Sequence, residues 1–152
     1  MHLRTATPGD IETILEHRVE MFRDMGYRDA QQLRLLVQVS REYFASALAN
    51  GGYHAVLAEI EGAGVVGGGG VVVCPWPGSV DRLQPRRPWI LNVYVRPEYR
   101  RRGIARSIMQ ELIDWCRTQG FDCVCLHASE VGRPLYEQIG FQPTNEMRLN
   151  LL

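Results

Sequence analysis

Apolar residues recur along the chain in two kinds of pattern, one with a helical period and one typical of strands. Apolar stripes spaced by three or four residues predict helices, whereas short runs of β-branched and aromatic residues predict strands. The predicted helices span residues 7–25, 29–49, 101–119 and 129–139. The predicted strands span residues 2–6, 53–60, 65–74, 89–95, 123–128 and 147–151. The order β-α-α-β-β-β-α-β-α-β predicts one mixed α/β sheet domain that covers residues 1–152.

The stretch 89–106 joins a buried strand to an amphipathic helix. Residues 89–95 are almost wholly apolar, which suits a strand buried on both faces, and Pro97 ends this strand because proline cannot donate a ladder hydrogen bond. The preceding strand contains the glycine run 67–70, which indicates a bulge or a close approach of the backbone to a neighbouring helix or a ligand. Residues 75–88 are predicted to form a long loop, and loops of this length are often lids.

An arginine-rich turn lies between the buried strand and the helix. Arg100, Arg101 and Arg102 precede Gly103, which leaves room for a phosphate group to approach the backbone. Free N–H groups converge at a helix N-terminus, and the helix dipole adds positive potential there. The turn therefore predicts an anion site, the alternative being a solvated helix start.

Two motifs resemble those of the GCN5-related N-acetyltransferases. The segment Arg100-x-x-Gly103-x-Ala105 is similar to the acetyl-CoA pyrophosphate loop of that superfamily, whose pattern is Gln/Arg-x-x-Gly-x-Gly/Ala. Residues 135–141, Leu-Tyr-Glu-Gln-Ile-Gly-Phe, resemble its late motif, Leu/Phe-Tyr-x-x-x-Gly-Phe. The Walker and Gly-x-Gly-x-x-Gly nucleotide motifs are absent. The order of the predicted elements extends the resemblance over nearly the whole chain.

This resemblance implies a partly splayed sheet with helices on both faces and a site for acetyl-CoA. In the family the central strand separates from its parallel neighbour, and the pantetheine arm pairs with the exposed backbone groups. The N–H groups of the arginine-rich turn would hold the pyrophosphate, with arginine side chains assisting at the 3′-phosphate. The implied cofactor-binding residues are Val93, Tyr94, Val95, Arg100, Arg101, Arg102, Gly103, Ile104, Ala105 and Arg106.

The implied reaction is direct transfer of an acetyl group from the thioester to a primary amine in a ternary complex. Tyr136 matches the family's general acid, which protonates the departing sulfur; the alternative is a half-buried helix tyrosine whose hydroxyl is bonded to a carbonyl. The central strand contains no carboxylate to act as the base that some members use. Asn92 and Ser129 are candidates to hold a water that relays the proton, and His127 is a candidate direct base near neutral pH.

The implied acceptor pocket lies between the first two helices, the central strand and the loop before it. The candidate substrate-binding residues are Glu20, Met21, Phe22 and Met25, and Glu20 is also a weaker candidate for the base. We expect the acceptor to be a primary amine of a small molecule or a peptide, and the sequence leaves open whether the chain forms a homodimer.

Composition narrows the remaining alternatives. Lys+Arg and Asp+Glu both count 17, and no aromatic residues interleave with the clustered arginines, which argues against a nucleic-acid binder. A non-catalytic CoA-binding or sensor protein on the same fold remains the competing hypothesis. The four cysteines are predicted to be reduced, small core residues, and no metal site is expected. We find no signal-peptide pattern and no apolar run long enough for a membrane span, so we expect a cytoplasmic protein without a membrane partner.

Overall fold

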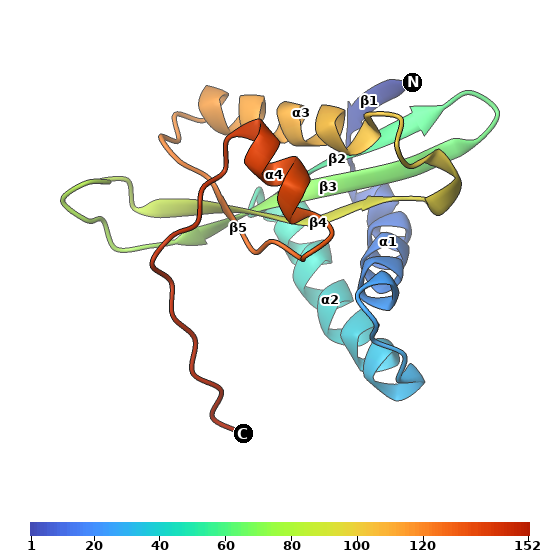
Figure 1. Cartoon of the computed structure of the whole chain (residues 1–152), viewed down its shortest axis with the longest axis horizontal. Helices are drawn as coiled ribbons and strands as arrows, with labels where there is room; N and C mark the ends of the chain where they lie inside the picture. Colours follow the sequence, from blue (N-terminus) through green and yellow to red (C-terminus); the bar gives the residue numbers. More distant parts are fainter.

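A five-stranded sheet carries helices on both faces in the computed structural model, which describes residues 1–152 (Figure 1). The strands are β1 (His2–Thr5), β2 (Tyr53–Ile60), β3 (Gly64–Pro75), β4 (Arg86–Val95) and β5 (Cys125–Leu126). They lie side by side in chain order, antiparallel from β1 to β4 and parallel between β4 and β5. The helices are α1 (Ile11–Asp24), α2 (Ala30–Asn50), α3 (Ile104–Thr118) and α4 (Arg133–Ile139). The mixed α/β architecture predicted from the sequence is confirmed.

Helices cover both faces of the sheet. Because side chains alternate along a strand, each strand contributes residues to the apolar clusters on both faces. On β2, Val56 and Ala58 belong to the apolar cluster that contains the buried side of α3. Tyr53, Ala55 and Leu57 on the same strand belong to a second cluster with residues of α1 and α2. In Figure 1, α3 and α4 accordingly lie above the sheet, and α1 and α2 lie below it.

The helices begin and end close to the predicted residues. Thr7 and Asp10 form a capping box at the short 3-10 helix η1 (Pro8–Asp10), which leads into α1. The Asp29 side chain accepts hydrogen bonds from the N–H groups of Gln31 and Gln32 at the start of α2. None of the helices combines the length and apolar character that crossing a bilayer requires.

Two predicted helix starts were wrong by three or four residues. The third helix begins at Ile104 rather than Arg101, because Arg101 and Gly103 adopt positive φ angles of 62° and 79° that a right-handed helix excludes. The fourth begins at Arg133 rather than Ser129. The Ser129 hydroxyl oxygen instead accepts a hydrogen bond from the N–H of Gly132, 3.1 Å away, in the turn before α4.

The predicted loop 75–88 is shorter than expected. β3 pairs with β4 from Gly67 opposite Val95 to Pro75 opposite Arg86, so that residues 86–88 belong to β4. Pro88 is tolerated in the strand because β5 pairs with β4 only from Trp89 onward, which leaves no ladder bond for proline to interrupt on that side. Residues 76–85 form the tip of this long hairpin, and a role as a lid stays a prediction.

The C-terminal end of the chain departs most from the sequence prediction. The strand expected at 123–128 pairs only at Cys125 and Leu126, and the strand expected at 147–151 is not formed. A strand needs a neighbour to complete its backbone hydrogen bonds, and residues 141–152 instead run away from the sheet without regular structure (Figure 1). The alternating pattern is present in the sequence, but this chain offers the tail no partner strand.

The cysteines differ in their surroundings. All four are free thiols. Cys116 is buried in the cluster under α3, and burial raises the pKa of its thiol to about 11, as expected of an unreactive core residue. Cys74, Cys123 and Cys125 are only partly buried, so the core prediction is confirmed for one cysteine of the four.

Candidate active site

β4 and β5 separate after two residue pairs. Trp89 pairs with Cys125 and Ile90 with Leu126, and no further pairs follow toward the end of β4. From Leu91 to Val95, the edge of β4 that faces away from β3 therefore has no neighbouring strand. The partly splayed sheet is present, and it leaves backbone N–H and C=O groups available for an extended ligand.

A β-bulge lies at the start of this open edge. The register between β3 and β4 slips between Gly68 and Gly70, so that Gly69 faces both Asn92 and Val93. Asn92 has a φ of 59°, a left-handed conformation that asparagine tolerates better than most residues. Bulges re-aim side chains next to functional sites, and this bulge turns the buried Asn92 side chain toward its hydrogen-bond partners, Arg18 of α1 and Tyr53 of β2.

The glycine run on β3 provides space as well as facing the bulge. A Cβ atom on Gly70 would lie 2.3 Å from the hydroxyl of Tyr53, and one on Gly68 would lie 2.8 Å from the Leu57 side chain. Glycine therefore lets the Tyr53 ring lie across β3. The bulge is on the partner strand, and the run also lies close to a helix, since a Cβ atom on Gly69 would be 3.1 Å from the Ile108 side chain of α3.

The turn before α3 presents six consecutive backbone N–H groups without a backbone acceptor, those of residues 101–106. The first helical hydrogen bond runs from the N–H of Ser107 to the carbonyl of Gly103, over 3.0 Å. Left-handed Arg101 and Gly103 curl the backbone so that it forms a concave nest of donors at the helix start. Such a nest suits a phosphate or pyrophosphate group.

The Arg100 side chain links this turn to β4 and α1. Its Nε donates to the carbonyl oxygen of Val95, 2.8 Å away, and its Nη2 donates to Asp24 at the end of α1. Its guanidinium also lies over the Tyr94 ring, 5.6 Å from the ring centroid. These contacts tie the end of β4 to α1, so this guanidinium is already engaged within the protein.

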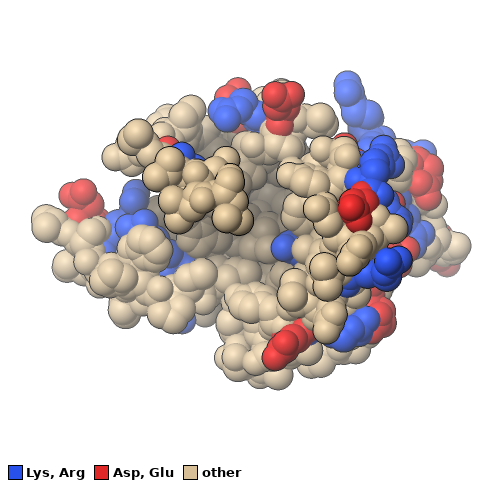
Figure 2. Space-filling view, turned by 90° about the horizontal axis from the view of Figure 1, so that it is seen from below, with Lys and Arg blue, Asp and Glu red and all other residues tan.

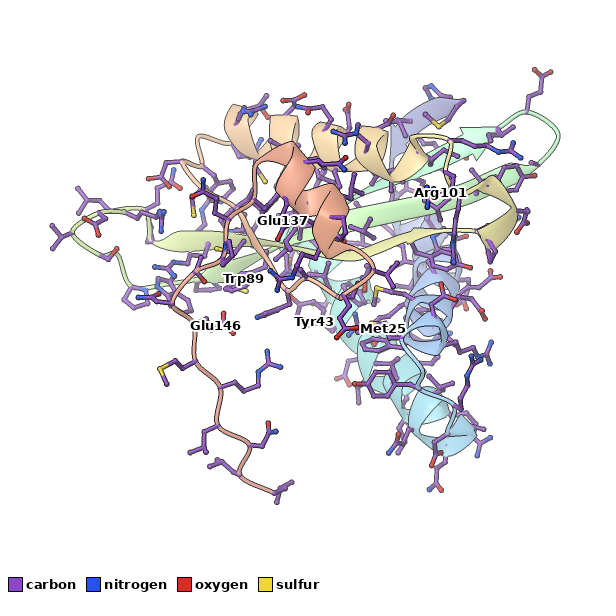
Figure 3. The ribbon with its side chains drawn as sticks, in the orientation of Figure 1. Met25, Tyr43, Trp89, Arg101, Glu137 and Glu146 are labelled. Atoms are coloured by element: carbon purple, nitrogen blue, oxygen red, sulfur yellow. The ribbon has the colours of Figure 1, made fainter.

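The other three arginines at this turn differ in the hydrogen bonds that their side chains form within the protein. Arg102 donates to the carbonyl oxygen of Glu98, and Arg106 donates to Oε1 of Gln138 on α4. Arg101 forms no hydrogen bond or ion pair, and Figure 3 shows its side chain beside the turn that precedes α3. Arg101 is therefore the cation of this group with the most donors left for a ligand.

The remaining cofactor candidates contribute in different ways. Val93, Val95, Ile104 and Ala105 pack in or against the cluster under α3. Their side chains serve the core, which leaves their backbone groups for a ligand. Tyr94 points to the opposite face, where its ring meets that of His17 at a centroid distance of 5.1 Å.

Tyr136 lies on α4 with its ring packed against the core. The ring meets Phe141 edge-on at 6.1 Å, and burial raises the pKa of the hydroxyl. No protein group accepts a hydrogen bond from this hydroxyl, so the alternative of a tyrosine bonded to a carbonyl is not what the structure shows. The hydroxyl is thus protonated at neutral pH and free to donate.

His127 and Ser129 lie between β5 and α4 with different roles. His127 is exposed, stacks on Trp89 at 4.9 Å and places its Nε2 3.1 Å from Oε1 of Glu146 in the C-terminal tail. Figure 3 labels Trp89 and Glu146 on the far side of α4 from Arg101. The structure therefore places His127 toward the start of β4, outside the core, whereas Ser129 caps the turn before α4.

The acceptor candidates lie on the last two turns of α1. Glu20 forms an ion pair with Arg23. Met21 and Phe22 are partly buried, and Met25, just past the helix, is exposed. Figure 2 shows a hollow between mostly uncharged walls, with basic side chains gathered on the right of the view.

A polar network that the sequence analysis missed joins α1, α2, β2 and β4. Nη1 of Arg18 donates to Oδ1 of Asn92 over 2.6 Å, and Nε of Arg18 donates to Oγ of Ser40 over 3.0 Å. Nδ2 of Asn92 donates to the hydroxyl of Tyr53 over 3.0 Å. One signal was available in the sequence: Arg18 stands four residues after Ile14, on the apolar stripe of the first helix.

A small cavity adjoins the network. It is lined by Ile14, His17, Tyr53, Ala55, Leu57, Gly68, Gly69 and Asn92. Burial, together with the charge of Arg96, lowers the pKa of His17 to about 4, and burial raises the pKa of Tyr53 to about 12. Both side chains are therefore neutral at pH 7, and the cavity itself holds no charge.

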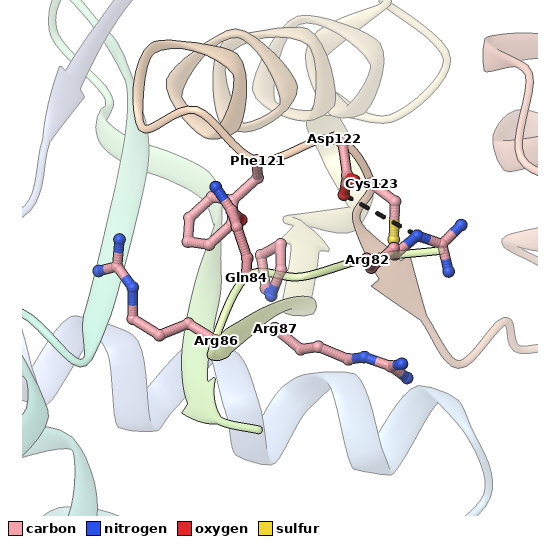
Figure 4. A pocket seen from close by; sticks show the side chains of 8 residues that line it. Arg82, Gln84, Arg86, Arg87, Phe121, Asp122 and Cys123 are labelled. Carbon is pink, nitrogen blue, oxygen red and sulfur yellow. Dashed lines mark ion pairs between the residues drawn. The ribbon is translucent and has the colours of Figure 1, made fainter. Parts of the chain in front are cut away.

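A second hollow lies between the β3–β4 hairpin and the start of the β5 segment (Figure 4). Arg82 lies 3.8 Å from Asp122, and Figure 4 shows the side chains of Arg86 and Arg87 pointing to opposite sides. These two arginines stack over separate aromatic rings, those of Phe121 and Trp76. Because its arginines diverge or are paired, this hollow is a weaker anion site than the turn before α3.

Comparison with known proteins gives a consistent picture. The model of the Acetyltransferase (GNAT) family matches residues 12–141. Glucosamine 6-phosphate N-acetyltransferase of Trypanosoma brucei brucei is 36% identical over 63 residues, 41% of this chain and 43% of that protein. The probable N-acetyltransferase camello of Xenopus tropicalis is 34% identical over 89 residues, 57% of this chain and 37% of that protein. The chain thus matches less than half the length of these relatives.

Two solved structures match nearly the whole chain. A GCN5-related N-acetyltransferase from Ralstonia eutropha JMP134 superposes with a TM-score of 0.91 at 36% identity, over 99% of this chain and 97% of that one. A predicted acetyltransferase with acetyl-CoA from Clostridium acetobutylicum superposes with a TM-score of 0.89 at 27% identity, over 99% and 96%.

Proposed function

Because this chain belongs to the acetyltransferase (GNAT) family of acyltransferases, we propose that it transfers an acetyl group from acetyl-CoA to a primary amine, directly, in a ternary complex. The observation that carries the proposal is the row of six free N–H groups at residues 101–106, next to the open edge of β4. The N–H groups supply a site for the pyrophosphate of CoA. The open edge of β4 supplies backbone groups with which the pantetheine arm can pair.

The residues present fit the proposed co-substrate. The N–H groups of residues 101–106 would bind the pyrophosphate, and the free guanidinium of Arg101 would bind a phosphate. The backbone of Val93 and Val95 would pair with the pantetheine arm. Gly103 keeps the nest open, because a Cβ atom there would meet no protein atom within 4 Å and would project into free space.

Two groups of the chain are suited to the acyl-transfer step. Acetyl-CoA supplies the activated acetyl thioester when it is bound. The N–H of Val93, at the bulge, would donate to the thioester carbonyl oxygen and stabilise the negative charge that develops there. The Tyr136 hydroxyl, kept protonated by burial, would donate its proton to the departing sulfur.

We propose that water removes the proton from the amine. The Asn92 side chain is already bonded to Arg18 and Tyr53, and the oxygen of Ser129 accepts from Gly132, so neither is free to act as a dedicated base. Their remaining hydrogen-bonding capacity and the open carbonyl groups of β4 can still orient a water molecule. Several weak acceptors then share the task.

Replacing His127 by asparagine tests this relay. Because His127 is exposed and bonded to Glu146, we expect turnover at pH 7 to stay within about threefold of the parent. The rate should rise with pH toward the pKa of the amine, without a separate limb at the ordinary histidine value of about 6.5. Loss of turnover at pH 7 that alkaline pH largely restores would make His127 the base and refute the relay.

Two measurements test the proposed function. Calorimetry should show binding of acetyl-CoA. A separate titration with duplex DNA tests the alternative of a nucleic-acid binder and should show no binding. Release of free thiol should then be followed on a panel of primary amines that includes glucosamine 6-phosphate, for which one relative is named. Since the sequence contains no lysine, self-acetylation of lysine adds no background. Binding without turnover on any amine would favour a CoA sensor, and no binding would refute both hypotheses.

A further inference from the structure

Arg18 lies at an unusual place for a charged side chain. Its guanidinium is wedged between aromatic rings, 5.1 Å from the centroid of Phe22 and 5.5 Å from that of Phe44. Two of its nitrogen atoms are held by Ser40 and Asn92. The planar group is thus fixed in orientation by two neutral hydrogen-bond partners and two rings.

No carboxylate balances this charge. Arg18 takes part in none of the ion pairs of the protein, and burial lowers the pKa of its guanidinium. A guanidinium has five N–H donors, and Nη2 of Arg18 donates to no protein group. Removing an unpaired charge from water is costly. The fold therefore maintains a cation whose partner the chain itself does not supply.

The position of Arg18 connects it to the reacting centre. Asn92, which accepts the 2.6 Å hydrogen bond from Arg18, is the left-handed residue of the bulge at the open edge of β4. Arg18 also lies one turn before Phe22, among the residues of α1 that face the proposed acceptor pocket. A group bound by the free Nη2 would lie close to an amine placed at the bulge.

We propose that Arg18 binds a carboxylate of the acceptor, so that the substrates are small amines that also carry a carboxylate group, such as amino acids. This inference rests on the proposed acetyltransferase function. A carboxylate accepts well from the planar fork of a guanidinium. A phosphate dianion is less suited, because neighbouring His17 is neutral and Arg18 is the single cation of the network.

The test compares amino acids with their carboxamides. Each pair shares its side chain and differs at the carboxyl group; because the amide also has an α-amine of lower pKa, the readout is the change that each variant makes in the ratio of kcat/KM for the acid to kcat/KM for the amide. We expect the parent enzyme to favour acids. Arg18→Met should lower kcat/KM for acids at least tenfold, the lower end for charge-assisted hydrogen bonds, and change kcat/KM for amides little. Arg34→Met, which removes an exposed arginine of α2, should leave the ratio unchanged.

Further measurements separate substrate binding from a structural role. Removing an unpaired, partly buried charge should leave the thermal stability of Arg18→Met equal or higher, whereas a structural arginine would make the variant less stable and slow both substrates equally. Arg18→Lys keeps the charge without the fork and should keep part of the acid preference. Turnover on amines without any preference for acids refutes this inference alone, and a preference for phosphoethanolamine over every acid refutes the carboxylate. No turnover on any amine refutes the proposed function itself.

A second, independent observation concerns the C-terminal tail. Met147, Leu149 and Leu151 alternate with the polar residues Arg148 and Asn150, the pattern of a strand with one apolar face. The three apolar side chains are 94%, 81% and 86% exposed. The tail extends away from the rest of the molecule (Figure 1), so this apolar face has no cover within the chain.

The sheet has an unpaired edge that could accept such a strand. β5 is the last strand, and its outer edge has no neighbour. Only two of its residues pair with β4, although the sequence predicts a strand of six. Unpaired sheet edges are templates for a further strand, and Glu146 already lies beside the β5 segment through its contact with His127.

We infer that the tail of one chain pairs with the β5 edge of a second copy, and that the exchange is reciprocal. A reciprocal exchange is closed by a two-fold axis and satisfies both chains at once. It covers the apolar residues of both tails and completes both sheets with a sixth strand. A second copy fits better than an unrelated partner because each copy offers both the tail and the edge.

Light scattering with size-exclusion chromatography tests the exchange in the 152-residue chain. We expect twice the 17.3 kDa mass of one chain. Leu149→Asp places a charge on the apolar face and should give a monomer, whereas Asn150→Asp introduces the same charge on the polar face and should keep the dimer. Hydrogen exchange should show protected amides at 147–151 in the dimer only. A monomeric parent, a dimeric Leu149→Asp variant, or an unprotected tail in the dimer would each refute the exchange.

Discussion

Tyr136→Phe is expected to lower kcat by about a hundredfold with little change in the KM for acetyl-CoA. The variant keeps the ring, which packs against Phe141, and deletes only a hydroxyl that no protein group uses. Burial raises the pKa of this hydroxyl, so the parent enzyme keeps its proton donor at all neutral pH values. In the pH profile of kcat, the alkaline limb that reports loss of this proton should therefore have a pKa above the ordinary tyrosine value of about 10.

The control for Tyr136 is another hydroxyl deletion outside the site. Tyr43 on α2 is exposed, and its ring contacts Phe44 edge-on. Tyr43→Phe should leave kcat unchanged. If Tyr136→Phe also keeps kcat within two- or threefold of the parent, Tyr136 is a packing residue and another group protonates the thiolate.

Gly103→Val is expected to weaken acetyl-CoA binding by at least tenfold, about 1.4 kcal/mol, measured by calorimetry. Gly103 has a φ of 79°, and an added side chain would meet no protein atom within 4 Å. We expect the added side chain to obstruct a pyrophosphate that approaches the free N–H groups at residues 101–106. A β-branched residue at this φ is also strained, which lowers stability independently of binding.

Gly62→Val separates strain from obstruction. Gly62 has a φ of 78° and equally open surroundings, but it lies in the turn between β2 and β3. Both variants should lose similar thermal stability, and only Gly103→Val should lose affinity. Equal affinities in the two folded variants would remove the pyrophosphate site from the turn before α3.

The turn before α3 could be predicted from sequence because its geometry is local. The strand, the proline that ends it, the arginine-rich turn and the amphipathic helix are adjacent in the chain, and Gly103 indicates the left-handed residue that directs the N–H groups inward. The left-handed conformation of Arg101 gave no such signal, and for that reason the helix was predicted to begin three residues early.

The acceptor side of the site depends on contacts between distant residues. Arg18 is 22 positions from Ser40 and 74 from Asn92, and Asn92 is 39 from Tyr53. These side chains meet only because α1 and α2 pack on the same face of the sheet, and because a bulge turns Asn92 toward them. No local pattern encodes that meeting, apart from one arginine on an apolar stripe.

The C-terminal tail shows the same division between local and distant information. The residues of the C-terminal tail determine by themselves that it can form a strand with one apolar face, since alternation is a property of consecutive residues. Whether the strand forms depends on a neighbour to accept its backbone hydrogen bonds. The sequence by itself therefore determined most of the elements, the glycine-containing turn before α3 and the position of Tyr136 on a helix. Only the tertiary structure decided which charge is left without a partner and which sheet edge is left open, because both depend on what surrounds a residue once distant segments have packed together.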